Sequence, residues 1–407
     1  MIELNRALGE WVVSLNTIFD WIVVGSGFTG AALAYELSRH QLQVLLLERH
    51  TSLQGATRFS YGGVAYWSGT TDMTRQLCAE GIALHRSLPD ELEADTQFRE
   101  LDLLLTIPAT EDPQRVAQTY AQFAIPPQFL TVQAACDLEP LLNRSAISGA
   151  LTVKHGHISP EAMNQAYLTA FLRQGGQIQT GTVTHLARPT TRQTAAVWCG
   201  ADCYQAAHIV VCAGALSRSL LRASDLSIPL YFTHAELVEL APTALSLHTM
   251  VMPADTKRFR LEAETSTTDR DRLWDQPGSE PVPPILDAGA IQLQDGRIRL
   301  GQISRALTDP DATSKAQESE AAIRQQVGAL LPKVQDLPGT WHHCLVAFSR
   351  DHLPLIGEVA SASGVYVFSG FSNPLAIVPP LARRFATQVV GATDPILAEL
   401  SPARFLP

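Results

Sequence analysis

The chain has 407 residues and a hydrophobic share of 46%, which is too long for one simple core and apolar enough to fill two. Its net charge of −10, without a cluster of lysines and arginines, argues against a nucleic-acid surface and against a patch that binds anionic membranes. The six cysteines form no CxxC pair and no His/Cys spacing typical of zinc sites. We therefore expect neither a metal site nor a redox disulfide.

Two segments bear on targeting and membranes. Residues 1–17 mix acidic and basic residues with a short apolar stretch at 11–15, which lacks the layout of a secretion signal. Residues 359–382 carry no charge, but serines, glycines and prolines interrupt them, so a strand, a loop and a helix fit better than a membrane span. We expect a cytoplasmic protein without a transmembrane segment.

Residues 20–50 predict one βαβ unit with a dinucleotide-binding turn in its middle. A buried strand ends in the sequence GSGFTG, a helix follows, and a second strand closes with Glu48. In such a turn Gly25 makes the tight bend, Gly27 lets the backbone approach a pyrophosphate, and Gly30 lets helix pack on strand. Glu48 lies about 20 residues past the turn, where a carboxylate can accept both hydroxyls of a ribose.

A second informative stretch follows in the middle of the chain. Residues 181–186 and 195–198 alternate like strands, and residues 207–215 predict a buried strand. That strand ends in the small residues Ala213 and Gly214, beside which a cofactor can lie close to the backbone.

The rest of the chain differs in character. Residues 226–300 contain period-2 runs interrupted by the polar, proline-rich residues 264–284, which predicts an antiparallel sheet with one exposed loop. Residues 365–370 predict a strand that returns to the cofactor-binding part, and Asn373 and Pro374 predict the N-cap and first residue of a helix. The cofactor-binding part is therefore discontinuous.

The order of these parts resembles that of the D-amino-acid oxidase superfamily of FAD-dependent oxidoreductases, which contains glycine oxidase, D-amino-acid dehydrogenase and monomeric sarcosine oxidase. The resemblance rests on GSGFTG at 25–30, Glu48, the small-residue turn GAT at 55–57 leading to Gly62 and Gly63, GHISP at 156–160, CAGA at 212–215 and DHLPLIG at 351–357. It implies a bound FAD and the removal of a hydride from a carbon that bears nitrogen.

The resemblance also implies an α/β fold. A discontinuous Rossmann-like FAD-binding domain is expected over residues 1–75, 140–225 and 335–407. A mainly antiparallel β substrate domain, α+β in class, is expected over residues 76–139 and 226–334.

The cofactor contacts are carried over from the same resemblance. The adenosine and pyrophosphate are expected against Gly25, Gly27, Gly30, Glu48, Val183, Ala213 and Gly214. The isoalloxazine is expected near Ala56, Thr57, Arg58, Gly370, Phe371, Ser372, Asn373 and Pro374. The remaining expected contacts are Ser26, Phe28, Thr29, Arg49 and Gly62.

The chain departs from the family pattern where the substrate should bind. Relatives that act on amino acids commonly carry an arginine shortly before the segment that matches residues 351–357, and Val346 stands at that place here. A substrate carboxylate must be bound from elsewhere, or the substrate has none. Arg299 is the first choice for a catalytic cation and Arg58 the second. The alternative for Arg299 and its neighbour Arg297 is the solvated face of a half-exposed strand.

Cys344 raises the question of how FAD is attached. It lies seven residues before Asp351, the spacing at which sarcosine-oxidase-like relatives carry a cysteine bonded to the flavin ring. His342 and His343 precede it and could lower the pKa of the thiol. An isolated cysteine in an apolar stretch is also a common inert core residue, so the linkage stays open.

We therefore expect an FAD-dependent oxidoreductase that oxidises a C–N bond of a small amine or amino acid, with oxygen or a quinone as electron acceptor. One alternative is a flavin-dependent hydroxylase, although its late Gly-Asp motif is not evident. A nicotinamide-linked dehydrogenase is another, but it would not return to the cofactor domain after residue 340. A third is a flavin-binding member with lost or changed substrate chemistry, as Val346 and Leu375 suggest.

Overall fold

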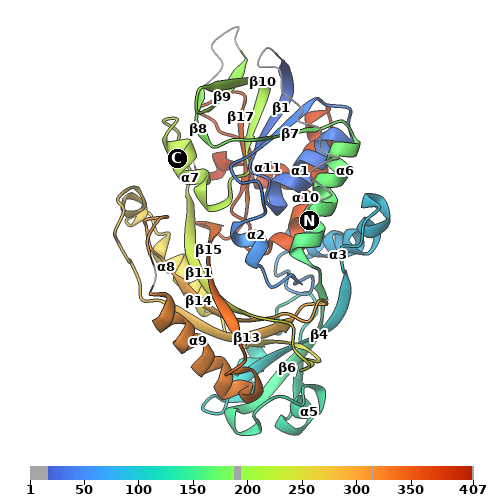
Figure 1. The fold of residues 1–407 in the computed structure, drawn as a ribbon, viewed down its shortest axis with the longest axis vertical. Coiled ribbons are helices and arrows are strands. Elements are labelled where there is room, and N and C mark those ends of the chain that lie inside the picture. The colour runs from blue at the N-terminus through green and yellow to red at the C-terminus, as the bar shows by residue number, and fades with distance from the viewer. Residues whose placement is uncertain (1–16, 188–193, 314, 406–407) are drawn as a thin grey trace.

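The computed structural model describes residues 17–187, 194–313 and 315–405, which form two β-sheets (Figure 1). Sheet A, the upper one in Figure 1, has the strand order β16-β17-β10-β1-β2-β7, with β9 paired to β10 and β8 paired to β9. Its strands are β1 (Ile18–Val24), β2 (Val44–Glu48), β7 (Gln177–Thr180), β8 (Val183–Ala187), β9 (Ala195–Cys199), β10 (Asp202–Val211), β16 (Leu355–Glu358) and β17 (Val365–Ser369).

The central strands of sheet A are parallel and buried on both faces. On one face Trp21 and Val23 pack with helices α1 (Phe28–Ser38), α6 (Pro160–Arg173) and α10 (Pro374–Val389). The apolar residues of the opposite face form a second core. Burial on both faces explains why these strands read as continuous apolar runs. Because β17, β10, β1, β2 and β7 all run parallel, their carboxyl ends meet at one edge of the sheet.

Sheet B has nine strands in the order β15-β11-β14-β13-β12-β4-β6-β3, with β5 paired to β6. Most of its pairs are antiparallel, and β12 with β4 is parallel. Its strands are β3 (Gly63–Val64), β4 (Arg99–Pro108), β5 (Gln128–Leu130), β6 (Ile147–His157), β11 (Leu230–Leu240), β12 (Met250–Pro253), β13 (Ile285–Gln292), β14 (Ile298–Arg305) and β15 (Gly339–Ser349).

Different helices lie on the two faces of sheet B. Helix α9 (Ala316–Leu330) packs Ile323 and Val327 against one face, which we call the outer face. Helix α2 (Gly55–Phe59) lies between the two sheets, on the side of sheet B that we call the inner face (Figure 1). The other helices are α3 (Asp72–Leu92), α4 (Pro113–Thr119), α5 (Val132–Leu138), α7 (Ser217–Arg222), α8 (Lys257–Thr265) and α11 (Pro395–Glu399), with short 3-10 turns at Arg144–Ala146, Gly214–Leu216, Asp271–Asp275, Pro332–Val334 and Pro402–Phe405.

The α/β fold predicted from the sequence is confirmed, including the βαβ unit and the late return strand β17. The domain boundaries stay a prediction. At two of them, the strand that follows the boundary pairs with a sheet other than the one expected. Strands β6 and β15 follow the expected boundaries at 140 and 335, yet both pair within sheet B. Their pairing partners lie far away in sequence, so local patterns do not reveal which sheet they join.

Two local expectations need correction. The segment 264–284 is not simply an exposed loop, because the 3-10 turn at Asp271–Asp275 buries Trp274 in an aromatic cluster. The expected small-residue turn at 55–57 is the start of helix α2. Apolar contacts to distant strands order the first segment. Helix α2 buries no residue, and its contacts instead include a hydrogen bond from Phe28 to Thr57 and the ion pairs of Arg58.

Candidate functional site

The carboxyl edge of sheet A collects the segments expected to bind the cofactor. The register pairs Val24 with Leu47 on one side and with Val211 on the other. Gly25 therefore follows directly beside Glu48 and Cys212. The ends of β10 and β17 bring the turns at Ala213 and Gly370 to the same edge. This is the edge at which open parallel sheets bind ligands.

Close packing explains the glycines of the first turn. A Cβ on Gly25, whose φ is +104°, would lie 2.7 Å from the carbonyl oxygen of Cys212. A Cβ on Gly30 would lie 1.8 Å from the carbonyl oxygen of Gly25. A side chain at either position would displace backbone, so only glycine permits this turn between strand and helix. The amino end of α1 is thereby held at the sheet edge, where its free N–H groups favour phosphate.

Glu48 is held in place at the end of β2. Its Oε2 accepts hydrogen bonds from the backbone N–H and the hydroxyl of Ser26, at 2.8 and 3.0 Å, and its Oε1 accepts the His50 N–H at 3.0 Å. The carboxylate is half-buried and lies at the edge where a ribose is expected. Arg49 is exposed beside it, and Val183 begins β8, which pairs with β9.

Helix α2 is tied directly to the cofactor turn. The hydroxyl oxygen of Thr57 accepts the N–H of Phe28 at 3.0 Å, and a Cβ on Gly27 would lie 3.2 Å from it. Thr29 and Ala56 are partly exposed in the same region. Gly62 follows with a φ of +76° and accepts a backbone hydrogen bond from Ile158.

The loop from Gly370 to Pro374 is anchored by its own side chains. Asn373 donates its amide to the carbonyl of Ala65 at 3.1 Å, so its side chain does not cap helix α10, although Asn373 is the N-cap residue and Pro374 begins the helix. Ser372 donates to the carbonyl of His352 at 2.9 Å, and Phe371 is buried. This loop is therefore rigid at the edge where the isoalloxazine is expected.

The residues at this edge fit an FAD. Gly214 has a φ of +54° and no atom lies within 4 Å of a Cβ built there, so the backbone at the end of β10 faces open space. Glu48 would hold the ribose, the amino end of α1 the pyrophosphate, and the Gly370 loop the flavin ring.

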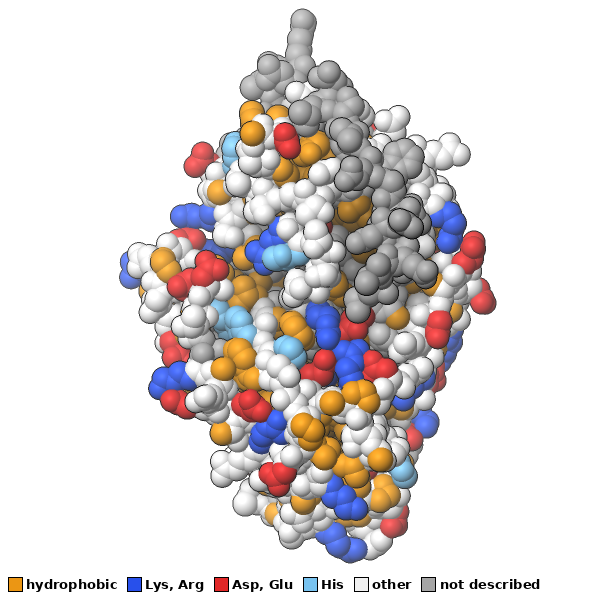
Figure 2. All heavy atoms as spheres, viewed as in Figure 1, with side chains coloured by type: hydrophobic (Ala, Val, Ile, Leu, Met, Phe, Trp, Pro, Cys, Tyr) orange, Lys and Arg blue, Asp and Glu red, His pale blue; other side chains and the backbone are white. Residues whose placement is uncertain are grey.

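Both expected catalytic residues lie in a partly buried ion cluster on the inner face of sheet B. Arg58, Arg297 and Arg299 surround Glu161 and Glu239. Arg299 donates to Glu239 at 2.9 Å, to Glu161 at 3.1 Å and to the carbonyl of Ser60. Arg58 pairs with Glu239 at 3.1 Å and with Glu161, and Arg297 pairs with both at 3.1 Å. Basic and acidic side chains gather near the middle of the face shown in Figure 2.

This ion cluster has a strong effect on Glu239. Burial alone would raise the pKa of its carboxyl, but hydrogen bonds from Arg58 and Arg299 outweigh burial and lower the pKa to about 2. Arg299 has a fully buried side chain, whereas a quarter of the Arg58 side chain is exposed. The alternative that Arg297 and Arg299 lie on a solvated face is therefore wrong, and a direct catalytic role for Arg58 or Arg299 stays a prediction.

Cys344 and Val346 lie on β15, where Val346 pairs with Thr233 of β11. Burial raises the pKa of the Cys344 thiol to about 12, although Arg299 acts in the opposite direction. His343 lies 2.8 Å from His234, and His342 stacks on Phe59, so neither imidazole is bonded to the thiol. The thiol is neutral at ordinary pH, and the linkage to FAD stays a prediction.

Sequence reasoning missed three polar groups on the inner face. Within the part of the chain that the structure describes, Tyr61 Oη, Thr233 Oγ1 and Asp287 Oδ1 are buried and have no hydrogen-bond partner. Such atoms are costly unless something binds them. The one available signal was an aspartate inside the otherwise apolar strand β13, whose sequence is ILDAGAIQ.

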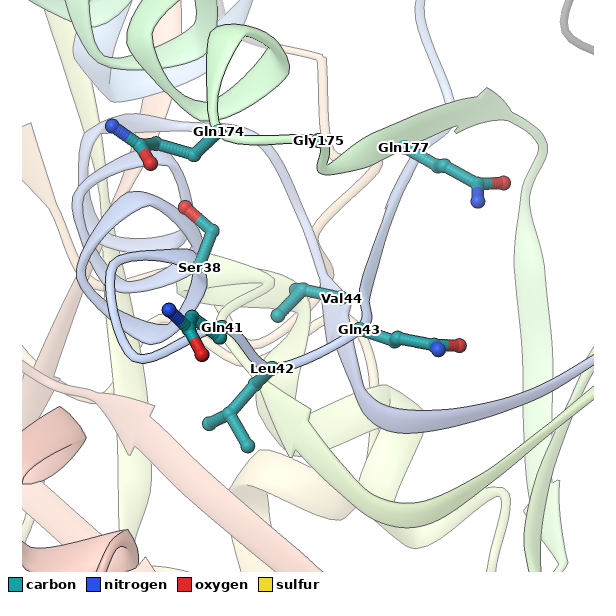
Figure 3. Close-up of a pocket in the computed structure, with 8 residues that line it drawn as sticks. All are labelled: Ser38, Gln41, Leu42, Gln43, Val44, Gln174, Gly175 and Gln177. Atoms are coloured by element: carbon teal, nitrogen blue, oxygen red, sulfur yellow. The ribbon is translucent and has the colours of Figure 1, made fainter.

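Two surface pockets lie away from this edge. The larger, of about 480 Å³, is lined by Ser38, Gln41, Leu42, Gln43, Val44, Gln174, Gly175 and Gln177 (Figure 3). It sits at the amino ends of β2 and β7, the opposite end of sheet A from the cofactor turn. The second, of about 360 Å³, lies between β16, β17, α10 and α11. Neither contains an expected site residue.

Two other kinds of feature are absent from the described residues. None of the helices in residues 17–187, 194–313 and 315–405 is long and apolar enough to cross a membrane. Over the same ranges no group of His, Cys, Asp or Glu side chains is placed to hold a metal ion.

Comparisons with known proteins agree with this geometry. Residues 20–388 match the DAO family model, described as FAD dependent oxidoreductase. The 4-methylaminobutanoate oxidase (formaldehyde-forming) of Paenarthrobacter nicotinovorans is 26% identical over 53% of this chain and 27% of its own length. One component of the anaerobic glycerol-3-phosphate dehydrogenase of Escherichia coli is 29% identical over 42% of this chain and 31% of its own length. The chain thus spans about three tenths of the length of these two relatives.

The similarity in fold extends over more of the chain than the similarity in sequence. The crystal structure of glycine oxidase from Geobacillus kaustophilus superposes with a TM-score of 0.77 over 96% of this chain and 99% of that chain, at 19% identity. At this level of identity the likeness is one of fold.

Proposed function

Since the chain belongs to the DAO family of FAD-dependent oxidoreductases, we propose that it oxidises the C–N bond of a small amine or amino acid by hydride transfer to its flavin. One observation supports this proposal above the others. The edge that fits the cofactor is linked through α2 to the inner face of sheet B, on which Tyr61, Thr233 and Asp287 each have a buried polar atom with no partner in the described chain. Polar groups left unpaired beside a cofactor site are what a small polar substrate requires.

The chemistry needs few reactive side chains. The bound flavin supplies the two-electron acceptor that the reaction needs. The substrate carbon loses its hydrogen with the bonding electron pair, the C–N bond becomes an imine, and water hydrolyses the imine to a carbonyl compound and an amine or ammonia. Oxygen or a quinone takes the electrons afterwards.

The protein supplies orientation and charge. We propose that Arg299 acts as a buried positive charge beneath the site and that Arg58, with its partly exposed side chain, is the arginine closest to substrate. Both guanidinium groups are already paired with Glu161 and Glu239, so neither is free to bind a substrate carboxylate strongly. This pairing favours an amine over an amino acid or a phosphate ester.

An anaerobic substrate panel tests the proposal. The purified, FAD-loaded enzyme is mixed with amines, N-methyl amino acids, D- and L-amino acids and sn-glycerol 3-phosphate, and the absorbance of oxidised flavin is followed. We expect bleaching by at least one compound that contains nitrogen. Bleaching by glycerol phosphate alone would contradict the proposal and assign the chain to the chemistry of its glycerol-3-phosphate dehydrogenase relative.

A further inference from the structure

Asp287 points toward the inner face of sheet B. Its neighbours in β13, Leu286 and Ala288, pack into the core on the α9 side. Ile291, which has the same parity as Asp287, packs into the core of the inner face. Because side chains alternate along a strand, the Asp287 carboxylate lies on the same face as Arg299 and α2.

The Asp287 carboxylate forms no ion pair within the described chain, although the charges of Arg258 and Lys257 lie near enough to lower its pKa against the effects of burial and Asp255. Its Oδ1 is buried and finds no hydrogen-bond partner in the described residues. The nearby Lys257 pairs instead with Asp255, at 2.8 Å, and Arg258 binds Glu262 and the carbonyl of Ser372. Burial and then the neighbouring Asp255 raise the pKa of Asp287 to about 6. A buried oxygen of an ionisable carboxyl group that has no hydrogen-bond partner is costly unless something binds it.

A second, independent group lies close to it. The buried hydroxyl of Tyr61 has no hydrogen-bond partner, and a Cβ on Gly301 would lie 3.1 Å from that oxygen. Gly301 pairs with Gly289, two residues along β13 from Asp287, so Tyr61 Oη lies over the same stretch of the sheet. Burial and then the charge of Asp287 raise the pKa of Tyr61. Thr233, only 1% exposed, presents a third unpartnered oxygen on the same face, directly across from Val346.

We propose that Asp287 and Tyr61 bind a positively charged group of the substrate, at a distance from the C–N bond that is oxidised. The substrate class is then a diamine, or an amine with a second cationic group, rather than an amino acid. This inference rests on the proposed function. It follows from charge complementarity. One buried oxygen of Asp287 has no partner among the described residues, whereas the arginines are already paired with Glu161 and Glu239 and Val346 offers no charge.

A binding experiment on the FAD-loaded enzyme tests this without turnover. Putrescine carries two amines, n-butylamine carries one, and γ-aminobutyrate replaces the distal amine with a carboxylate. Each is titrated by calorimetry under anaerobic conditions at pH 7.5. We expect putrescine to bind at least tenfold more tightly than n-butylamine, and γ-aminobutyrate to bind most weakly.

Variants assign the effect to Asp287. Asp287→Asn should remove the preference for putrescine, and Asp287→Glu should restore part of it because the charge is kept. Tyr61→Phe should weaken putrescine binding severalfold. The matched control is Asp102→Asn in β4, where the carboxylate already pairs with Lys154 at 3.0 Å, and it should bind like the wild type. Retained FAD absorbance and circular dichroism show that each variant is folded.

The outcomes separate this inference from the proposed function. Equal affinity for putrescine and n-butylamine, or an unchanged preference in Asp287→Asn, overturns the inference even if amines reduce the flavin. A preference for putrescine that depends on Asp287 supports the inference. If no amine then bleaches the flavin, the proposed function fails while the cation site remains.

Discussion

Arg299 donates its Nε to Oε2 of Glu239 at 2.9 Å, although the Arg299 side chain has no exposed surface at all. The same guanidinium reaches Glu161 at the start of α6 and the backbone of Ser60 just after α2. This pair therefore joins sheet B to the two helices that approach the cofactor edge. A residue expected to act on substrate is thus also a structural link between the halves of the molecule.

Arg299→Met should destabilise the protein by about 3 kcal/mol or more, because breaking a buried pair leaves an uncompensated charge behind. Urea unfolding of the FAD-loaded protein measures this. The control is Arg115→Met, whose side chain is 71% exposed beside Glu111 and which should change stability by less than about 0.5 kcal/mol. An Arg299→Met variant with normal stability and impaired flavin reduction would instead make Arg299 a catalytic cation.

Acid should weaken the same ion cluster over a defined pH range. The pKa of Glu239 falls from its usual 4.5 to about 2 in the folded state, since arginine hydrogen bonds outweigh burial. A carboxyl whose folded pKa is depressed stabilises the protein above its unfolded pKa and loses that contribution as pH falls toward the folded value. Glu239→Gln should therefore be less stable than wild type at pH 7 and closer to it at pH 3. A constant difference across this range would contradict the account.

Much of the cofactor edge was predictable, because its signals are local. The turn from Gly25 to Gly30 and Glu48 lie in one βαβ unit, so their spacing defines their geometry. The ion cluster was not predictable, because Arg58 and Glu239 are 181 residues apart and meet only through sheet pairing. Period-2 alternation placed Arg297 and Arg299 on one face, but it could not tell whether that face was solvated.

Glu48→Ala should weaken FAD binding about tenfold or more, since hydrogen bonds to a charged group contribute about 1.5–3 kcal/mol each. The carboxylate also holds Ser26 of the cofactor turn, so the variant loses orientation as well as contacts. The FAD-to-protein ratio after gel filtration measures the effect. Glu111→Ala, at an exposed pair, is the control. Equal flavin content in wild type and Glu48→Ala would show that the ribose is bound elsewhere.

FAD should be released by acid precipitation, leaving the yellow colour in the supernatant. Covalent attachment needs a thiolate, and burial raises the pKa of Cys344 to about 12. Cys344→Ala should therefore retain as much FAD as the wild type. A yellow pellet from the wild type and a colourless one from Cys344→Ala would establish the covalent bond instead.

Putrescine binding should depend on pH through Asp287. Burial and Asp255 raise the pKa of its carboxyl to about 6, against the opposing charges of Arg258 and Lys257, so the carboxylate is mostly ionised above that pH and mostly neutral below it. Affinity should fall as pH is lowered from 7.5 to 5, and Asp287→Asn should abolish this dependence. A flat profile in the wild type would remove Asp287 from the site.

The environment of Asp287 could not be predicted from the sequence. The sequence of β13 is typical of an ordinary buried strand. An aspartate in such a strand is compatible with a β-bulge as well as with a binding site. Only the three-dimensional arrangement shows that Lys257 pairs with Asp255 and that Tyr61 lies beside Gly301, whose partner in β13 is Gly289. Partners of this kind come from α8, β13 and the segment after α2, which no local pattern connects.

The most direct test of the central claim is a product balance in a single anaerobic turnover. The FAD-loaded enzyme is reduced by the best amine of the panel, and the carbonyl product and released amine or ammonia are measured against the flavin bleached. The account predicts one carbonyl compound and one amine or ammonia for each flavin reduced, as C–N oxidation followed by hydrolysis requires. Reduced flavin without a released amine or ammonia, or reduction only by an alcohol substrate, would contradict it.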